Sequence, residues 1–323
     1  MKITTKELFQ NCYGKYGIAA INVFTMEQVL AVFEAAQKAD SPVIIQTTPV
    51  ARDYANPAIL VSMTKAAAMI FPKVVYALHL DHGYESHLIH AIDSGEYTSV
   101  MIDASHDDFE KNVKRTCNIV KLAHAKGISV EAELGVLSGV EDDIEVKDEF
   151  AKFTNPKQVV EFVDRTSCDS LAIAVGTSHG AYKFSGKQGI RFDILKEIQD
   201  LLPGYPLVLH GGSSVDPEEI DKINSFGGAL KTGSRGVSDK EIQNSINFGV
   251  CKINIATDLR VLWTRVHRDF FQNQPDGFDP LIPGKIYKNE LIDFLLKKFK
   301  MLGSEGMAKG ITEVIDEGIT LNK

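Results

Sequence analysis

The stretch VVYALHLDHGYESHLIHAIDSGEYTSVMI, Val74 to Ile102, contains the pattern that decides the fold. Its β-branched and apolar runs predict strands at Val74–Leu80 and Thr98–Ile102. The amphipathic segment between them, Tyr84–Ser94, predicts a helix. Two strands joined by a crossover helix run parallel in one sheet. This βαβ unit is therefore the predicted building block of the fold.

The same alternation continues along the whole chain. The predicted strands are Gly17–Val23, Pro42–Thr47, Val74–Leu80, Thr98–Ile102, Ile128–Glu133, Ser170–Val175, Pro206–His210 and Val250–Ile255. The predicted helices that join them are Thr25–Ala39, Ala58–Met69, Tyr84–Ser94, Phe109–Lys126, Pro156–Thr166, Phe192–Leu202, Pro217–Phe226 and Asp239–Phe248. Eight such units fit an α/β fold in which the strands close into a (β/α)₈ TIM barrel, and an open doubly wound sheet is the alternative.

Additions are expected at both ends of this barrel. Thr4 and Glu7 have the spacing of a capping box, which predicts a short helix over Thr5–Tyr13. The segment from Asn289 onward predicts C-terminal helices, and a long acidic loop is expected over Leu134–Asn155. We expect residues 1–323 to form a single barrel domain.

Composition excludes several classes of protein. The net charge of −8 argues against a broad surface for nucleic acid or anionic membranes, although a local basic pocket for a phosphorylated metabolite remains compatible with it. The longest apolar runs fall well short of the roughly 20 residues that a membrane span needs. The four cysteines are far apart and the N-terminus lacks the apolar run of a signal peptide, which indicates a reduced, cytoplasmic protein.

Polar or ionisable side chains end every predicted strand. In chain order these are Asn22, Thr47, Thr48, Asp81, His82, Asp103, Glu131, Glu133, His179, His210 and Asn254. In a (β/α)₈ barrel the carboxyl ends of the strands meet at one rim, where the active site forms. We therefore expect these side chains to converge.

Three histidines occupy equivalent places after the third, sixth and seventh strands: His82, His179 and His210. Three imidazoles can bind Zn²⁺ and leave one coordination position open, as in catalytic zinc sites. A lone histidine is more often a hydrogen-bonded surface or core residue, but three together favour a metal. Asp81, which precedes His82, is either a general acid or base or a partner that orients a histidine.

Glycines lie beside these histidines. Gly180 follows His179, and Gly211, Gly212 and Ser213 follow His210. Glycine allows backbone amides to approach an anion closely, and barrel enzymes commonly bind phosphate in the loops after their last two strands. The groups that add charge or a hydroxyl there are Lys183, Arg260 and Thr257.

Seven motifs together resemble one family, the class II (zinc-dependent) ketose-bisphosphate aldolases, which include fructose-bisphosphate aldolase. In chain order they are AINV, ALHLDHG, SVMIDAS, SVEAELG, AVGTSHGAYKF, LVLHGGSS and CKINIATDLR. The resemblance implies a TIM barrel that reversibly cleaves fructose 1,6-bisphosphate into dihydroxyacetone phosphate and glyceraldehyde 3-phosphate, a reaction of glycolysis and gluconeogenesis. It also implies a homodimer or homotetramer.

The resemblance assigns roles to the metal and acid–base residues. It implies that His82, His179 and His210 hold the zinc, and that Asp81 protonates the C4 oxygen as the carbon–carbon bond forms or takes that proton in cleavage. Asp103 and Glu133 match positions that hold a second or displaced metal. The loop after the fifth strand reads GVEDD, and either Glu141 or Asp142 matches the carboxylate that deprotonates dihydroxyacetone phosphate.

The resemblance also implies a pocket for the substrate, with a monovalent cation, Na⁺ or K⁺, beside the dihydroxyacetone phosphate half. The residues expected to bind substrate are Asn22, Thr48, Gly180, Lys183, Gly211, Gly212, Ser213, Asn254, Ala256, Thr257 and Arg260. Among these, Arg260 matches the group that meets the distant phosphate.

Two positions depart from the family pattern. Family members specific for fructose 1,6-bisphosphate usually have aspartate at Ala256, whereas tagatose-bisphosphate aldolases tend to have alanine. A common serine after the second strand is replaced, and Thr48 supplies the hydroxyl instead. The basic insertion before the last strand and the FDP sequence at Phe278–Pro280 favour the fructose branch.

Three other functions fit parts of the pattern. A Schiff-base aldolase would need a lysine inside the barrel, and Lys252 in the last strand is the candidate, although its position below the rim disfavours it. A metal-dependent hydrolase would use the same histidines to activate water, but it does not explain the phosphate loops. A non-catalytic sugar-phosphate-binding protein would not need Asp81 and all three histidines.

Overall fold

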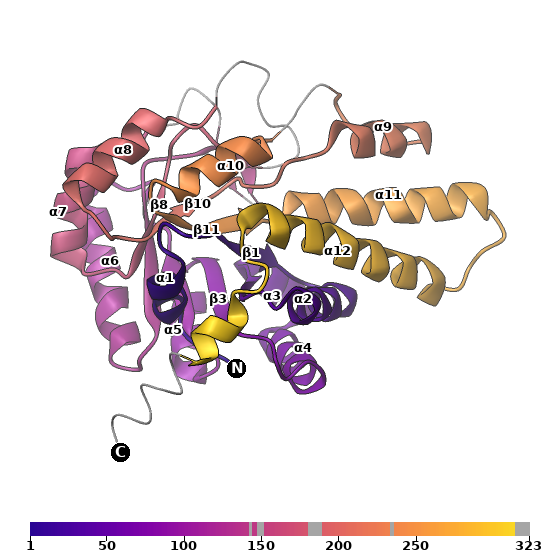
Figure 1. Cartoon of the computed structure of the whole chain (residues 1–323), viewed down its shortest axis with the longest axis horizontal. Helices are drawn as coiled ribbons and strands as arrows, with labels where there is room; N and C mark the ends of the chain where they lie inside the picture. The colour runs from indigo at the N-terminus through magenta and orange to yellow at the C-terminus, as the bar shows by residue number, and fades with distance from the viewer. Residues whose placement is uncertain (142–143, 147–151, 180–188, 233–235, 314–323) are drawn as a thin grey trace.

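The computed structural model describes residues 1–141, 144–146, 152–179, 189–232 and 236–313, and it confirms the (β/α)₈ barrel. Neighbouring strands of the barrel are parallel and close in the order β1-β11-β10-β8-β5-β4-β3-β2. Helices surround these strands (Figure 1). These strands are β1 (Ile18–Asn22), β2 (Val43–Thr47), β3 (Tyr76–Gly83), β4 (Ser99–Ile102), β5 (Ser129–Leu134), β8 (Ser170–Ile173), β10 (Leu207–Leu209) and β11 (Val250–Ile255). Each of them lies within three residues of its predicted bounds.

Most helices also match their predicted segments. These are α1 (Thr5–Cys12), α2 (Met26–Ala39), α4 (Pro57–Ile70), α5 (Glu85–Ser94), α6 (Phe109–His124), α7 (Pro156–Thr166), α8 (Phe192–Leu201), α9 (Pro217–Ser225) and α10 (Asp239–Ile246). None of the helices in the described part of the chain is long and apolar enough to cross a membrane.

Three helices differ from the prediction. The short α3 (Pro49–Ala55) and the long α11 (Thr257–Asn273) were not predicted, and α12 (Leu281–Leu302) begins well before Asn289. The proline and glycine near the start of α12 resemble a break, but the backbone N–H groups of a first helical turn need no intrahelical partner. Helices α11 and α12 lie side by side and extend away from the barrel (Figure 1).

Apolar side chains fill the N-terminal end of the barrel, and the polar strand-end residues lie at the opposite end. Leu8 and Phe9 of α1 share one buried cluster with Ile18, Ile44 and Ala77 from the first halves of three strands. Larger apolar residues on the outer faces of the strands pack against the surrounding helices in the main core. The carboxyl ends of the strands form the rim at the opposite end of the barrel.

A small second sheet replaces part of the expected acidic loop. It consists of β6 (Ser138–Glu141), β7 (Ile144–Val146) and β9 (Ser178–His179), in the order β7-β6-β9. Gly139 pairs with His179 in parallel register, which joins the segment after β5 to the segment after β8. Two rim segments that are distant in sequence therefore lie together.

Candidate active site

A bulge in β3 directs two consecutive residues toward the same site. The register between β3 and β4 shifts between Leu80 and Gly83, so β3 carries one extra residue there. Side chains alternate between the two faces of a regular strand, and a bulge breaks that alternation. His82 occupies the bulge with φ of 47°, a conformation that non-glycine residues adopt mainly at special sites. Asp81 and His82 are therefore both available to one site, where strict alternation would separate them.

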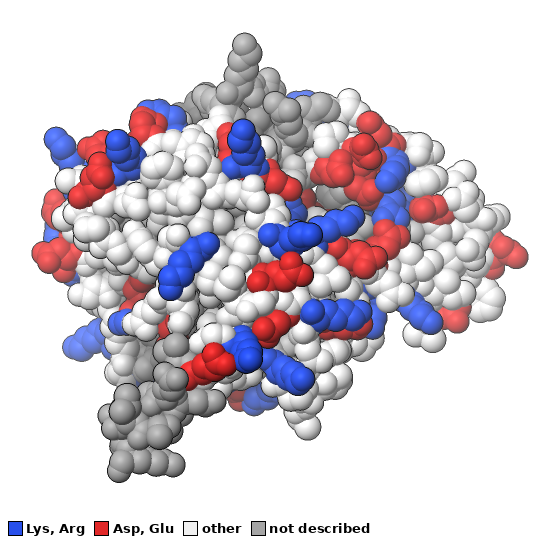
Figure 2. Space-filling view, in the orientation of Figure 1, with Lys and Arg blue, Asp and Glu red and all other residues white. Residues whose placement is uncertain are grey.

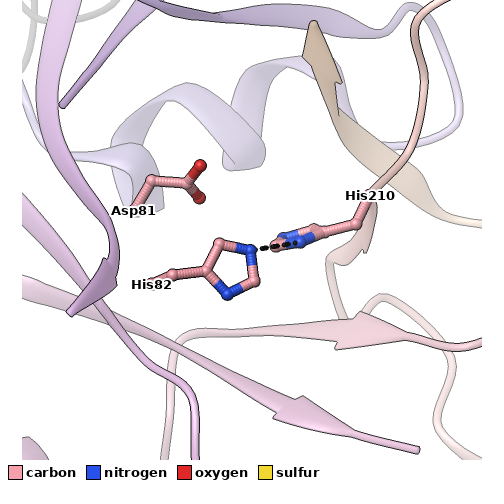
Figure 3. A group of neighbouring side chains, drawn as sticks. All are labelled: Asp81, His82 and His210. Atoms are coloured by element: carbon pink, nitrogen blue, oxygen red, sulfur yellow. Dashed lines mark hydrogen bonds between the residues drawn. The ribbon is translucent and has the colours of Figure 1, made fainter. Parts of the chain in front are cut away.

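The imidazoles of His82 and His210 face each other across the rim. His82 Nε2 lies 3.0 Å from His210 Nδ1, and the Asp81 carboxylate lies beside the pair (Figure 3). One ligand atom from each of the three residues lies within 4.8 Å of the others. Two nitrogens bound to one tetrahedral zinc at 2.0–2.1 Å are roughly 3.3 Å apart. The spacing therefore fits a shared cation.

Carboxylates behind the two histidines fix the tautomers of their rings. His82 Nδ1 lies 3.1 Å from Asp103 Oδ2, and His210 Nε2 lies 3.0 Å from Glu131 Oε1. The ring tautomers in which each outer nitrogen donates its hydrogen to a carboxylate leave both inner nitrogens with lone pairs directed at each other, whereas any other tautomer allows a hydrogen bond between the two rings. Facing lone pairs repel unless a cation lies between them, so the donor set fits a metal ion.

Burial and the neighbouring charges support these protonation states. Burial lowers the pKa of His210, which favours the neutral imidazole that metals require. Burial by itself would raise the pKa of Asp103, but hydrogen bonds with His82 and Ser105 outweigh it and hold that pKa below its usual range.

A second group of possible ligands consists of His82, Asp103 and Glu133, whose ligand atoms also lie within 4.8 Å of one another.

A fully buried lysine pairs with Glu131, the carboxylate that contacts the ring of His210. Lys252 Nζ lies 2.8 Å from Glu131 Oε2, and both side chains are inaccessible to solvent. Burial would raise the pKa of Glu131, but the Lys252 charge and the hydrogen bond with His210 lower it overall. Glu131 therefore stays ionised between a cation and a metal-ligand candidate. An ammonium held in this ion pair is no free nucleophile, which disfavours a Schiff-base mechanism.

Three amides hold the Asp81 carboxylate. Asn22 Nδ2 donates to Oδ2 at 3.0 Å, Gln46 Nε2 donates to the same oxygen at 3.3 Å, and Asn254 Nδ2 donates to Oδ1 at 3.2 Å. Hydrogen bonds to the charged form favour an ionised carboxylate. Asn22 and Asn254, which we expected to touch substrate, therefore contact the predicted acid–base residue. Gln46 was missed, since it precedes the polar strand end.

The loop after β10 meets the N-terminus of α11. Ser213 Oγ accepts the backbone N–H groups of Ala256 and Thr257 at 3.2 and 3.1 Å. These two bonds join the loop after β10 to the first turn of α11. A helix N-terminus with nearby backbone amides is a site that favours anions. The arrangement therefore fits a phosphate group.

Gly211 brings this loop against the segment that carries His179. Its φ is 67°, and a Cβ atom there would lie 2.4 Å from the carbonyl oxygen of Ser178. Glycine meets both requirements, because it tolerates positive φ and has no side chain to collide.

Nearly the whole chain matches one family of enzymes. The family model described as fructose-bisphosphate aldolase class-II matches residues 3–307. The chain belongs to this family. It is 42% identical to a fructose-bisphosphate aldolase of Giardia intestinalis, over 91% of this chain and 90% of that protein. It is 40% identical to a fructose-bisphosphate aldolase of Thermus caldophilus, over 95% of this chain and 100% of that protein.

Solved structures show the same relationship for the fold of this class-II aldolase. The crystal structure of the YdjI aldolase from Escherichia coli K12 is similar, with a TM-score of 0.75 and 30% sequence identity, and the match covers 95% of this chain and 100% of that one. Family membership implies a divalent metal, and the facing nitrogens of His82 and His210 supply a candidate place for it.

Two further predicted residues lie at the rim of the class-II aldolase barrel. Thr48 is buried and caps α3, where its Oγ1 accepts the backbone N–H of Ala51 at 3.2 Å. Arg260 of α11 places its guanidinium 5.9 Å from the centre of the Phe24 ring. These contacts place both residues beside the loops that follow β1 and β2.

Several predicted site residues lie outside the described part of the structure. They are the side chains of His179 and Glu141, together with Asp142, Gly180 and Lys183. The backbone of His179 is described and belongs to β9. Its neighbour Ser178 lies beside Gly211, so the backbone of the third predicted ligand is close to the loop that follows His210.

Proposed function

We propose that this class-II aldolase uses Zn²⁺ to cleave fructose 1,6-bisphosphate reversibly into dihydroxyacetone phosphate and glyceraldehyde 3-phosphate. The observation that carries the proposal is the pair of facing imidazole nitrogens, 3.0 Å apart, with the Asp81 carboxylate beside them. His82, His210 and His179 would hold the ion. Imidazole ligands favour zinc over magnesium or calcium, which prefer oxygen.

A zinc ion held by these residues would supply a Lewis acid for the C2 oxygen of the ketose, which would stabilise the electron pair left on C3 when the bond between C3 and C4 breaks. Asp81 accepts the proton of the C4 hydroxyl during cleavage and returns it during condensation. The amides of Asn22, Gln46 and Asn254 suit this role, since they orient the carboxylate and favour its ionised form.

In the direction of condensation, a second carboxylate removes a proton from C3 of dihydroxyacetone phosphate. We assign this step to Asp142, with Glu141 as the neighbouring alternative. Asp103 and Glu133 would provide a second position for the metal, next to His82.

The two phosphates of the substrate would bind at different parts of the rim. The backbone and hydroxyl donors around Ser213 and the N-terminus of α11 suit the phosphate of the dihydroxyacetone phosphate half. We assign the rest of this pocket to Gly180, Lys183, Gly211, Gly212, Asn254 and Thr257, with a sodium or potassium ion beside it. Arg260 and Thr48 would meet the distant phosphate.

Ala256 leaves two ketose bisphosphates as candidate substrates. A carboxylate at this position is absent, so the side chain offers no polar contact that separates the C4 epimers. The basic insertion before β11 and the FDP sequence favour fructose 1,6-bisphosphate, and tagatose 1,6-bisphosphate is the alternative.

The test compares the rates of cleavage of the two ketose bisphosphates, with and without a chelator. We expect faster cleavage of fructose 1,6-bisphosphate, and loss of both activities when the metal is removed. Activity that persists in the metal-free protein would contradict the proposal. We also infer a single-domain, cytoplasmic protein that forms a homodimer or homotetramer, and light scattering would measure its oligomeric state.

A further inference from the structure

We propose that Lys298 is a positioning residue for the phosphate-binding loop, so that the C-terminal helix α12 forms part of the active site. Lys298 lies outside the barrel and near the end of α12. Its ammonium group donates to Ser214 Oγ, in the loop that follows β10. This proposal rests on the proposed function, because it concerns how the same loop binds phosphate.

The ammonium group of Lys298 is largely shielded from solvent and contacts Ser214, Asp239 and Phe294. Its side chain is 8% exposed, and its Nζ lies 2.9 Å from Asp239 Oδ1, whose own side chain is 55% exposed. The Nζ also lies 5.6 Å from the centre of the Phe294 ring. A buried ammonium loses hydration and needs hydrogen bonds to compensate, so its bond to Ser214 is a significant part of its environment.

The loop is fixed from the same side by a carboxylate. Asp258 of α11 accepts the backbone N–H of Ser214 at 3.0 Å and that of Val215 at 2.8 Å. Lys298 thus holds the side chain of Ser214 while Asp258 holds its backbone. The residue before Ser214 is Ser213, which accepts the backbone N–H groups at the start of α11. The bonds from Lys298 and Asp258 therefore set the position of the hydroxyl that we assign to phosphate.

A cavity beside Lys298 allows its side chain to be replaced without disturbing the hydrophobic core. Lys298, Asp239 and Asp258 line a cavity of about 1140 Å³, together with residues of α9, α11 and α12. Acidic and basic side chains lie side by side over this part of the surface (Figure 2). Replacement of the ammonium by an uncharged side chain of similar length is accommodated beside such a cavity. A loss of phosphate affinity can then be separated from unfolding.

The experiment compares K298M and K298R with the control K297M. Lys297 is the next residue on α12, is exposed and lines the same cavity. For each variant, steady-state rates with fructose 1,6-bisphosphate give kcat and KM, calorimetry gives the Kd of dihydroxyacetone phosphate, and mass spectrometry gives the metal content. Thermal unfolding establishes that each variant is folded.

We expect K298M to raise both KM and the Kd of dihydroxyacetone phosphate by about tenfold, the scale of one hydrogen bond to a charged group. The metal content should stay unchanged and kcat should change much less than KM. K298R keeps the charge and should stay close to wild type, as should K297M. In addition, S214A should weaken affinity, and K298M in that background should add little, because Lys298 acts through Ser214.

An unchanged Kd in folded K298M would overturn the inference, as would an equal loss in K297M or additive losses in the double variant. Failure of the proposed function has a different signature. In that case the wild-type protein would cleave no ketose bisphosphate, whatever residue occupies position 298.

Discussion

Replacement of Lys252 by methionine tests the buried ion pair beneath the proposed metal site. Methionine keeps most of the length of the side chain and removes the charge. Lys252 Nζ lies 2.8 Å from Glu131 and 3.8 Å from Asp81, and none of the three side chains is more than 1% exposed. The variant K252M therefore leaves two buried carboxylates close together with no lysine between them.

The size of the effect follows from this burial. Removal of one partner from a buried ion pair destabilises a protein by about 3–5 kcal/mol. For a chain of 323 residues, the entropy of unfolding is about 0.7 kcal/mol/K. The melting temperature should therefore fall by about 4–7 °C. The low folded-state pKa of Glu131 means that the pair contributes fully above the unfolded pKa of about 4.3, and that its contribution declines as pH falls below that value.

The assay is thermal and chemical unfolding of metal-free protein at pH 7 and at pH 4, for wild type, K252M and the double variant E131Q/K252M. The double variant removes both charges, while glutamine can still accept the hydrogen bond of His210. We expect it to recover more than half of the lost stability at pH 7, and we expect the deficit of K252M to be smaller at pH 4. A double variant no more stable than K252M, or a deficit independent of pH, would refute the ion-pair argument.

Four further outcomes are expected. D81N should lower kcat by about 10²–10⁴-fold with unchanged metal content, and wild-type turnover in this variant would exclude Asp81 as the acid–base group. G211A should lower stability by at least about 1–3 kcal/mol, since φ is 67° and its Cβ would lie 2.4 Å from the Ser178 carbonyl; unaltered melting would contradict this reading. Burial lowers the pKa of His79 to about 3, so the unfolded state binds more protons below about pH 6.5, and the metal-free protein should lose stability as pH falls from 6.5 toward 3, measured by urea unfolding. Turnover lost to a chelator should return with Zn²⁺ and not with Mg²⁺, and rescue by Mg²⁺ would argue against histidine ligation.

The barrel could be predicted because the periodicity of each segment is local. Each strand is a short apolar run and each joining helix is amphipathic, so the alternation identifies the fold without knowledge of any contact. The prediction missed α11 because its first turn, beginning at Thr257, follows β11 after one residue and contains residues that suggest a binding loop. It missed α3, whose seven residues are too few to show a helical period.

The sequence predicted which polar residue types lie at the rim of the barrel, whereas it did not predict the contacts among them. The rim residues followed from their positions at the ends of strands. The bulge at His82 breaks the alternation of side chains between the two faces of β3, and no feature of the sequence predicts it. The ion pair of Lys252 with Glu131 crosses the barrel between strands that are not neighbours, and Lys298 reaches a residue 84 positions away. Such contacts depend on how the barrel closes and on how α12 returns to it.

The bulge also has a consequence for how the site responds to motion. Asp81 and His82 are joined by a single peptide bond, so bond lengths and angles limit the separation of the carboxylate from the imidazole. A shift of β3 relative to β10, which lies across the barrel, carries both groups together and changes their distance to His210. A designer who grafts this bulged dipeptide onto another β-barrel would transfer the carboxylate and one imidazole in a fixed relation. Only the position of the second imidazole, on the facing strand, would then need to be optimised.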